Sequence, residues 1–118
     1  MFSVKVGSMF SSAHYLRGYK GKCEGLHGHN WKVEVVVESE ELDRLGMVLD
    51  FKYLKKKLNR LLDNLDHRCL NHLAYFKKVN PTSENISKYI YLKLKPKVKN
   101  LKSVVVWESS TSSAIYSE

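Results

Sequence analysis

A regular alternation of polar and apolar residues from His27 to Glu38 constrains the fold of this chain more than any other feature. The odd-numbered positions from Trp31 to Val37 carry one tryptophan and three valines, whereas positions 30, 32, 34 and 38 are polar. A period of two is that of a β-strand with one buried face. The sequence therefore predicts a strand here, and its buried face also carries the side chains of His27 and His29.

Three further segments are predicted to be strands. The first fourteen residues alternate, with Val4, Val6 and Phe10 on one parity and Lys5 and Ser11 on the other. Near the end of the chain, a valine-rich segment and the segment that follows a serine-rich turn also favour strands. These two strands are expected at Ser103 to Trp107 and at Ser113 to Ser117.

Two helices are predicted between the strand pairs. Asp50 is a suitable N-cap for a helix whose leucines recur at three- and four-residue spacing. A second helix is expected to begin after Pro81, with Thr82 or Ser83 as its cap, and to end at Pro96. The order strand, strand, helix, helix, strand, strand predicts an α+β fold, a four-stranded antiparallel sheet with both helices on one face.

The composition fits a single domain that spans residues 1–118. A chain of 118 residues, 43% of them hydrophobic, can form one core but not two. No apolar run reaches the roughly 18 residues that would cross a bilayer, and the first residues lack the apolar segment of a signal peptide. With two cysteines and no leader, we expect a cytoplasmic protein with reduced thiols and no membrane partner.

The chain is basic, with twenty Lys and Arg residues against twelve Asp and Glu residues and a net charge of +8. Much of the excess lies at Lys52 to Arg60 and at Lys88 to Lys102. Such a charge can serve solubility, attract an anionic small substrate or contact nucleic acid. Most of these residues are lysines, and the sequence has no RNA-recognition signature or glycine-rich phosphate loop, so no nucleic-acid partner is expected.

Three histidines are placed as metal ligands would be. His27 and His29, two apart on a strand, project from one face with Cβ atoms roughly 6.5–7 Å apart. His14 occupies an even-numbered position, like the apolar residues of the first strand. It reaches the same end of the sheet if the first two strands pair. Three neutral imidazoles without a fourth protein ligand describe a catalytic zinc site with an open position. The alternative is a set of rings that are only packed or hydrogen-bonded.

Cys23 lies in the glycine- and lysine-rich loop between the first two strands, four residues before His27. A thiol near a metal ion and near Lys20 and Lys22 is expected to have a lowered pKa and some thiolate character. Two other roles stay open for Cys23, a small loop residue and a fourth zinc ligand that would close the site. Cys69 has no comparable surroundings and is expected to pack in the interior.

Two further groups carry candidate chemistry. Asp66 and His67 follow the first helix and can form an oriented proton-transfer unit, although this dipeptide is also common as a helix-end feature. A second metal cluster with Cys69 and His72 is disfavoured, because His67 and His72 are five residues apart. Glu108 ends a strand, where its carboxylate can accept two hydrogen bonds from a guanidine-like edge or simply face solvent.

Several motifs together resemble one known family. They are Phe10 to His14 (FSSAH), Cys23 to Asn30 (CEGLHGHN), VLDF at 48–51, LDHR at 65–68, PTSEN at 81–85 and Trp107-Glu108. This set resembles the family of 6-pyruvoyltetrahydropterin and 6-carboxytetrahydropterin synthases over essentially the whole chain. The resemblance implies the tunnelling fold (T-fold) and a ring-like homo-oligomer, usually a hexamer, with active sites at subunit interfaces.

The resemblance also implies a zinc-dependent lyase that acts on dihydroneopterin triphosphate. The three histidines would bind Zn²⁺, and Cys23 would be the thiolate base. Asp66 and His67 would form the second proton-transfer unit, contributed by a neighbouring subunit. Glu108 would anchor the amino-pyrimidinone edge of the pterin. The residues that would contact the triphosphate are not defined, and the candidates are Lys20, Lys22 and Arg68.

Three residues separate Cys23 from the His-Gly-His motif. This spacing resembles the 6-carboxytetrahydropterin synthases of the queuosine (7-deazaguanine) pathway, which would release acetaldehyde and triphosphate. The pyruvoyl-forming members usually have a longer spacer. Glu24 leaves a third activity open, because in members that cleave the side chain to 6-hydroxymethyl-dihydropterin a Glu in this loop replaces the Cys as base.

Overall fold

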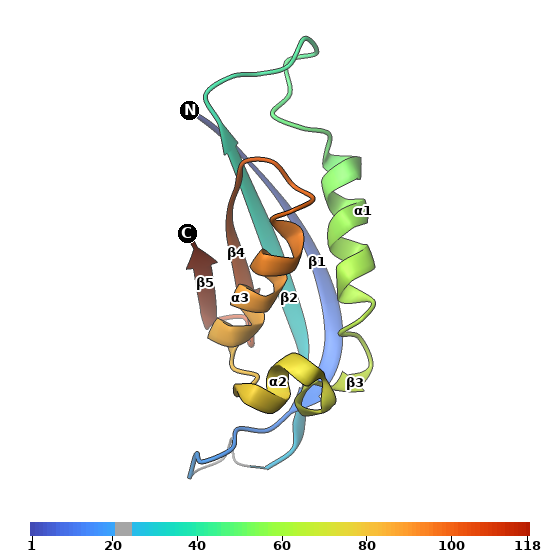
Figure 1. Cartoon of the computed structure of the whole chain (residues 1–118), viewed down its shortest axis with the longest axis vertical. Helices are drawn as coiled ribbons and strands as arrows, with labels where there is room; N and C mark the ends of the chain where they lie inside the picture. Colours follow the sequence, from blue (N-terminus) through green and yellow to red (C-terminus); the bar gives the residue numbers. More distant parts are fainter. Residues whose placement is uncertain (21–24) are drawn as a thin grey trace.

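Five strands form one sheet in the order β3-β1-β2-β4-β5 in the computed structural model, which describes residues 1–20 and 25–118 (Figure 1). Four strands pair antiparallel, as predicted, and one pairs parallel with β1. The strands are β1 (Phe2–His14), β2 (His27–Ser39), β3 (Arg68–Cys69), β4 (Leu101–Trp107) and β5 (Ser113–Ser117).

The short strand β3 makes the sheet mixed, which the predicted four-stranded sheet did not include. Two residues are too few to show a period of two, so no sequence pattern marks them. Their partners are Ser12 and Ala13 near the end of β1. The α+β architecture is otherwise confirmed.

The two long strands pair over their full length. The register runs from Phe2 opposite Ser39 to His14 opposite His27. The pairing on which the position of His14 depended is therefore confirmed. Facing residues of paired strands point to the same side of the sheet, so His14 and His27 share one face.

Two long helices cover one face of the sheet (Figure 1). They are α1 (Phe51–Leu62) and α3 (Ser83–Leu94). The side chain of Asp50 accepts a hydrogen bond from the Lys52 amide at 2.8 Å, and Thr82 rather than Ser83 caps α3, through the Asn85 amide. A 3₁₀ turn η2 (Leu70–His72) and a short helix α2 (Ala74–Lys78), neither predicted, connect them.

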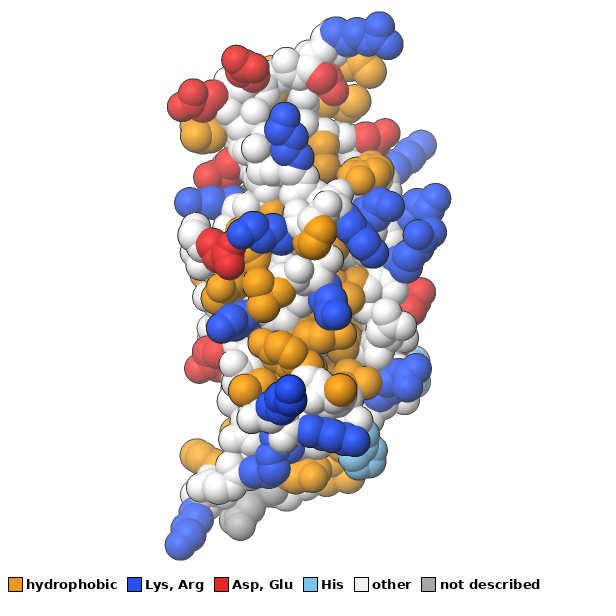
Figure 2. All heavy atoms as spheres, viewed as in Figure 1, with side chains coloured by type: hydrophobic (Ala, Val, Ile, Leu, Met, Phe, Trp, Pro, Cys, Tyr) orange, Lys and Arg blue, Asp and Glu red, His pale blue; other side chains and the backbone are white. Residues whose placement is uncertain are grey.

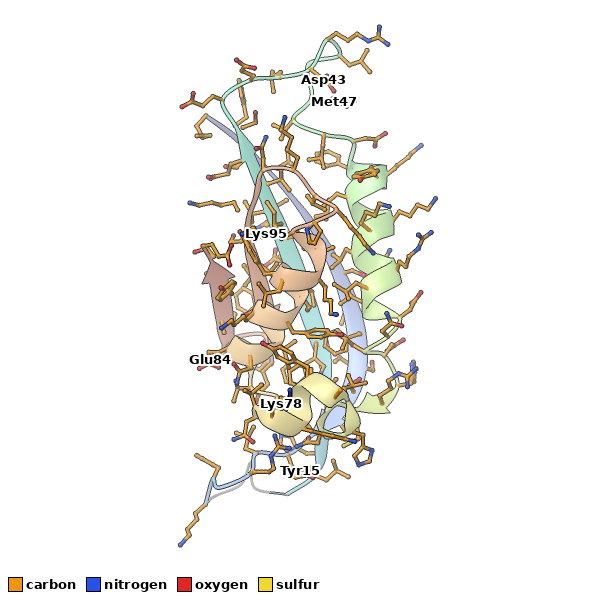
Figure 3. All side chains as sticks on the ribbon, in the orientation of Figure 1. Tyr15, Asp43, Met47, Lys78, Glu84 and Lys95 are labelled. Atoms are coloured by element: carbon orange, nitrogen blue, oxygen red, sulfur yellow. The ribbon has the colours of Figure 1, made fainter. Side chains whose placement is uncertain are left out.

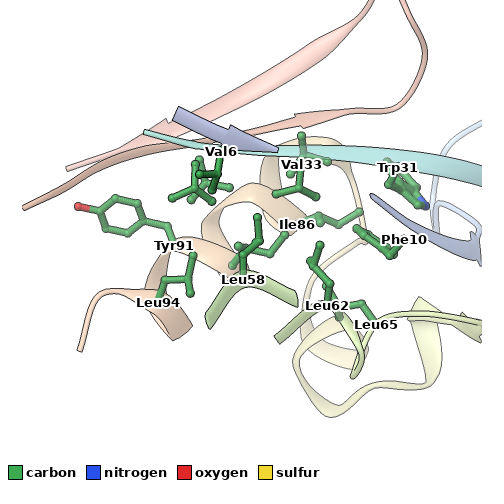
Figure 4. Packing of buried hydrophobic residues seen from close by; sticks show 14 of the residues in the cluster. Val6, Phe10, Trp31, Val33, Leu58, Leu62, Leu65, Ile86, Tyr91 and Leu94 are labelled. Carbon is green, nitrogen blue, oxygen red and sulfur yellow. The ribbon is translucent and has the colours of Figure 1, made fainter. Parts of the chain in front are cut away.

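A continuous apolar core joins the helices to the sheet (Figure 4). Val6 and Val33 on the strands face Leu58 of α1 and Ile86 of α3, and the last three are fully buried. Burying one such side chain stabilises the fold by about 1.5–3 kcal/mol. This core fixes both helices on the face of the sheet that carries the histidines.

The two ends of the sheet differ. Figure 3 shows Asp43 and Met47 in the loop at one end and Tyr15 at the other. The loop that contains Asp43 and Met47 is stabilised by the Asp43 carboxylate, which accepts hydrogen bonds from the amides of Leu45 and Met47. The end near Tyr15 is the one where His14 and His27 meet. Within the described residues, no helix is both long and apolar enough to cross a membrane.

Candidate active site

Three histidines and one glutamate converge at the end of the sheet near Tyr15. His14 ends β1, His27 and His29 begin β2, and Glu108 directly follows β4. One ligand atom from each of these four residues lies within 4.8 Å of the other three. His14 is almost fully buried, at 1% exposure, and the other three are half-buried. The predicted convergence of the three histidines is present in the structure.

The outer nitrogens of two rings are held by backbone carbonyls. His14 Nδ1 lies 2.7 Å from the Pro81 oxygen, and His27 Nδ1 lies 2.7 Å from the Gly25 oxygen. Because a carbonyl can only accept, each ring carries a proton on Nδ1, and a neutral ring then has a lone pair on Nε2. The two Nε2 atoms face each other at 3.1 Å.

Two facing lone pairs at this distance repel unless a cation lies between them. Ligand nitrogens about 2.0–2.1 Å from a tetrahedral ion are about 3.3–3.4 Å apart, close to the observed separation. The tautomer that the two carbonyls impose is thus the one that binds a metal. The donor set fits a metal ion.

His29 supports the same conclusion independently. Its Nε2 is buried and has no hydrogen-bond partner among the described residues. The nearest carboxylate oxygen, Oε1 of Glu108, is 3.5 Å away and is not aligned for a hydrogen bond. A buried polar atom without a partner costs about 1–3 kcal/mol. A metal ion held by the three rings would provide that partner.

The Trp31 ring forms the apolar side of the histidine cluster. Its ring is fully buried and lies 4.9 Å from the His14 ring and 5.0 Å from the His29 ring, centroid to centroid. Burial lowers the pKa of His14 and of His29, and the opposing effects of the Pro81 carbonyl on His14 and of Glu108 on both rings are smaller. The two rings are therefore kept neutral, which is the form that binds a metal.

Glu108 lies between the histidines and a cleft of about 410 Å³. Its Oε2 accepts a weak hydrogen bond from Ser83 Oγ at 3.4 Å, and its amide donates to the Ser112 carbonyl. Glu84, Ala114 and Ser113 also border this cleft. The carboxylate can therefore contact a ligand in the cleft or join the metal as a fourth ligand.

Asp66 and His67 are coupled to each other but do not belong to the histidine cluster of the same chain. Asp66 Oδ2 lies 2.9 Å from His67 Nδ1, and Asp66 Oδ1 accepts from the Ser11 amide at 2.8 Å. The Ser11 amide, together with the nearby His67, lowers the pKa of Asp66. The His67 side chain is 83% exposed, and its backbone is in the left-handed region with φ of 55°. Such a backbone is uncommon for a residue other than glycine and recurs at functional sites.

Cys23, Lys22 and Glu24 lie outside the described residues. The structure does describe how the first part of their loop is attached. The Asn71 side chain accepts from the Tyr15 amide at 3.0 Å and donates to the Tyr15 carbonyl at 2.9 Å. Asn80 makes the same two contacts with the backbone of Arg17.

Sequence reasoning did not find these two asparagines as loop supports. Asn71 is 3% exposed, and a buried amide of this kind usually has backbone partners. Asn80 lies just before the predicted second helix, but the backbone partners of both asparagines were not predictable from the sequence. Of the other residues considered, Cys69 is a half-buried free thiol, and within the described chain it does not join Asp66, His67 and His72 in a metal cluster.

The sheet, the helices on one of its faces and the histidine cluster at its end together define a tunnelling-fold protein with a site suited to a metal ion. Residues 3–118 match the family model described as 6-pyruvoyl tetrahydropterin synthase, and the chain belongs to that family. The predicted family and fold are therefore confirmed.

Named relatives cover most of the chain. It is 42% identical over 113 residues to a 6-carboxy-5,6,7,8-tetrahydropterin synthase of Synechocystis sp., covering 91% of this chain and 86% of that protein. It is 31% identical to the protein of the same name from Haemophilus influenzae, with full coverage of both. The solved structure of Caenorhabditis elegans 6-pyruvoyl tetrahydropterin synthase superposes with a TM-score of 0.90 at 32% identity, covering 99% and 95% of the two chains. These relatives support an enzyme of the pterin synthase type.

Proposed function

We propose that this protein is a zinc-dependent lyase. It converts 7,8-dihydroneopterin triphosphate and one water molecule to 6-carboxy-5,6,7,8-tetrahydropterin, acetaldehyde and triphosphate. The observation that carries the proposal is the convergence of the histidine Nε2 atoms beside a cleft bordered by Glu108. The names of the Synechocystis and Haemophilus relatives support this reaction among those of the family.

His14, His27 and His29 would hold Zn²⁺ through Nε2. Bound there, the ion would supply Lewis acidity that makes the side-chain hydroxyls of the substrate and the adjoining C–H more acidic. The carbonyls of Pro81 and Gly25 orient two of the rings and keep their outer nitrogens protonated. The buried Trp31 ring excludes water from one side of the cluster.

Glu108 would bind the pterin ring. A carboxylate accepts two parallel hydrogen bonds from an amino-pyrimidinone edge, as it does from a guanidinium group. The position of Glu108 between the cleft and His29 would then direct the substrate side chain toward the histidines. The substrate is thereby oriented before any proton moves.

Two groups would move the protons. Cys23 would act as thiolate base from the loop between β1 and β2. Asp66 would orient the His67 ring and stabilise its charged form, as the lowered pKa of Asp66 favours a permanent carboxylate. Because His67 is exposed and stands apart from the cluster of its own chain, we propose that it serves the site of a neighbouring subunit in a hexamer.

Product analysis tests the reaction. Zinc-loaded protein is given dihydroneopterin triphosphate, and the products are identified by mass spectrometry beside the variants Cys23→Ala and Cys69→Ala. We expect carboxytetrahydropterin and acetaldehyde from the wild type and from Cys69→Ala, and neither product from folded Cys23→Ala. Absence of turnover by a folded, zinc-loaded oligomer would refute the proposal.

The second candidate is 6-pyruvoyltetrahydropterin formation. The TM-score of 0.90 with the Caenorhabditis elegans enzyme of that name favours it. The same experiment separates the two reactions, because the pyruvoyl product keeps the three-carbon side chain and no acetaldehyde is formed. A 6-hydroxymethyl product would instead assign the base to Glu24.

A subunit-mixing experiment tests the shared site. Cys23→Ala and His67→Asn are each expected to be inactive, and asparagine tolerates the left-handed backbone at position 67. When both variants are co-expressed, some sites combine an intact Cys23 with an intact His67 from a neighbour, and turnover should return in part. Mixed oligomers that stay inactive would place both residues in the site of one chain.

A further inference from the structure

A second cleft, of about 320 Å³, lies between α1 and α3, and its lining residues other than Leu94 are exposed or half-buried at the surface of the helices. Figure 2 shows Lys and Arg side chains gathered on this face of the molecule, with hydrophobic side chains exposed between them. The lining of the cleft includes four cations, Lys57, Arg60, Lys93 and Lys97, together with Tyr89 and Leu94.

Four cations surround this cleft without a carboxylate to balance them. No Asp or Glu lies in α1, and the one acidic residue of α3, Glu84, is in its first turn, at the far end. Asp63 caps the end of α1 through its backbone and is not a lining residue. None of the four cations forms an ion pair within the described part of the chain. Like charges gathered around a partly enclosed cleft create a positive potential that favours a multiply charged anion.

The walls of the cleft are defined by packing. Leu94 is buried, and Tyr89 is held by contacts with the rings of Tyr75 and Phe76 at 5.0 and 5.4 Å. Lys93 Nζ lies 5.7 Å from the Tyr89 ring, which places this ammonium group beside the cleft. We propose that the cleft between α1 and α3 is a binding site for a compact polyphosphate anion. A small anion fits better than a nucleic-acid strand, because the cations surround one cleft and do not follow an extended track.

This site would be distinct from the candidate active site. Lys93 lies ten residues beyond Ser83 on the same helix, about 15 Å along its axis, and the two clefts share no lining residue. A ligand here would therefore bind in addition to the substrate. The inference goes beyond the proposed reaction and does not depend on it.

Calorimetric titration of the zinc-loaded oligomer with inorganic triphosphate, and separately with ATP, tests the site. The variant Lys57→Gln/Lys93→Gln removes one cation from each wall. The matched control Lys52→Gln/Lys55→Gln removes two cations from the same helix, outside the cleft. We expect the first variant to weaken binding of at least one of the two ligands about tenfold or more, and the control to change it less than about twofold.

The outcomes separate the alternatives. Equal affinity for triphosphate and ATP would show that the site recognises the phosphate groups and not the nucleoside. Tighter ATP binding that Tyr89→Leu abolishes would show a nucleotide site, and either result supports the proposal. Equal weakening in the cleft variant and in the control would show a response to net charge and overturn it. An unchanged affinity in Lys57→Gln/Lys93→Gln would also overturn the proposal. So would tighter binding of a single-stranded RNA oligomer than of either small anion, if the cleft variant loses that binding.

Discussion

The helix-covered face of β1 and β2 is apolar over most of its length and polar at one end. In the middle, Val33 and Val35 are fully buried against the helices. A few residues away on the same face, His27 and His29 point into a cluster of titratable groups. The two regions share one strand, one face and one period of two.

The difference follows from what covers each region. Over the valines lie helices, whose interior backbone groups already bond within the helix, so no partner remains for a polar side chain. Over the histidines lie loop segments, and the carbonyls of Gly25 and Pro81 are free to accept. A polar cluster is therefore tolerated at the loop end of the sheet and would be costly in its middle. Four experiments test this difference between the two regions.

The largest effect is expected from a change confined to the polar end. His29→Ala removes one of three nitrogens, and metal affinity should fall by more than the roughly 10–100-fold that loss of a supporting residue costs. The fold should persist, because this Nε2 has no hydrogen-bond partner to lose within the described chain. Metal content after gel filtration, measured with a competing chelator, checks this. Full metal content in the variant would show that His29 is only a packed ring.

A substitution in the apolar region should lower stability and leave metal binding unchanged. Leu58 is fully buried, and Leu58→Ala should lower the free energy of unfolding by about 2–5 kcal/mol. The metal-to-chain ratio should stay that of the wild type. Urea unfolding followed by tryptophan fluorescence measures the first effect. Lys55→Ala, on the exposed side of the same helix, serves as control and should change stability by less than about 0.5 kcal/mol.

A smaller effect is expected where the loop joins the polar end. Asn71→Leu keeps the side-chain size but removes two hydrogen bonds to the Tyr15 backbone, which should cost about 1–3 kcal/mol. Hydrogen exchange at the Tyr15 amide should become faster. The matched variant Asn80→Leu should do the same at Arg17 and leave Tyr15 protected. Unchanged exchange in both variants would show that the loop has other supports.

The smallest effect is a pH dependence at the sheet edge. The pKa of Asp66 is lowered in the folded protein, chiefly by the Ser11 amide, so the unfolded chain takes up the proton first as the pH falls. Asp66 therefore stabilises the fold above the ordinary Asp pKa, and this stabilisation is lost as the pH falls from there through the lowered pKa of the folded state. The Tm difference between wild type and Asp66→Asn should be full at pH 5–7 and should shrink as the pH falls below about 4. A difference that does not shrink at all as the pH falls from about 5 to about 2.5 would have another cause.

Much of the polar end was predictable from local periodicity. The alternation in β2 placed His27 and His29 on the core face, and the parity of β1 placed His14 there too. The capping residue Asp50 and the limits of α3 were likewise predictable, since helix signals are local. The two-residue strand β3 and the helix α2 were not, because they depend on contacts with β1 and η2.

Side chains along an extended strand alternate between the two faces of the sheet. The amino-acid sequence was therefore enough to show which side chains share a face and which of them can bind a metal. The packed fold decided which nitrogen of the His14 ring is free, because the Pro81 carbonyl that holds its Nδ1 is distant in sequence from His14. It also decided that Glu108 joins the histidines and that Asp66 and His67 do not. Periodicity describes one strand at a time, whereas a ligand set depends on how separate strands and loops pack together.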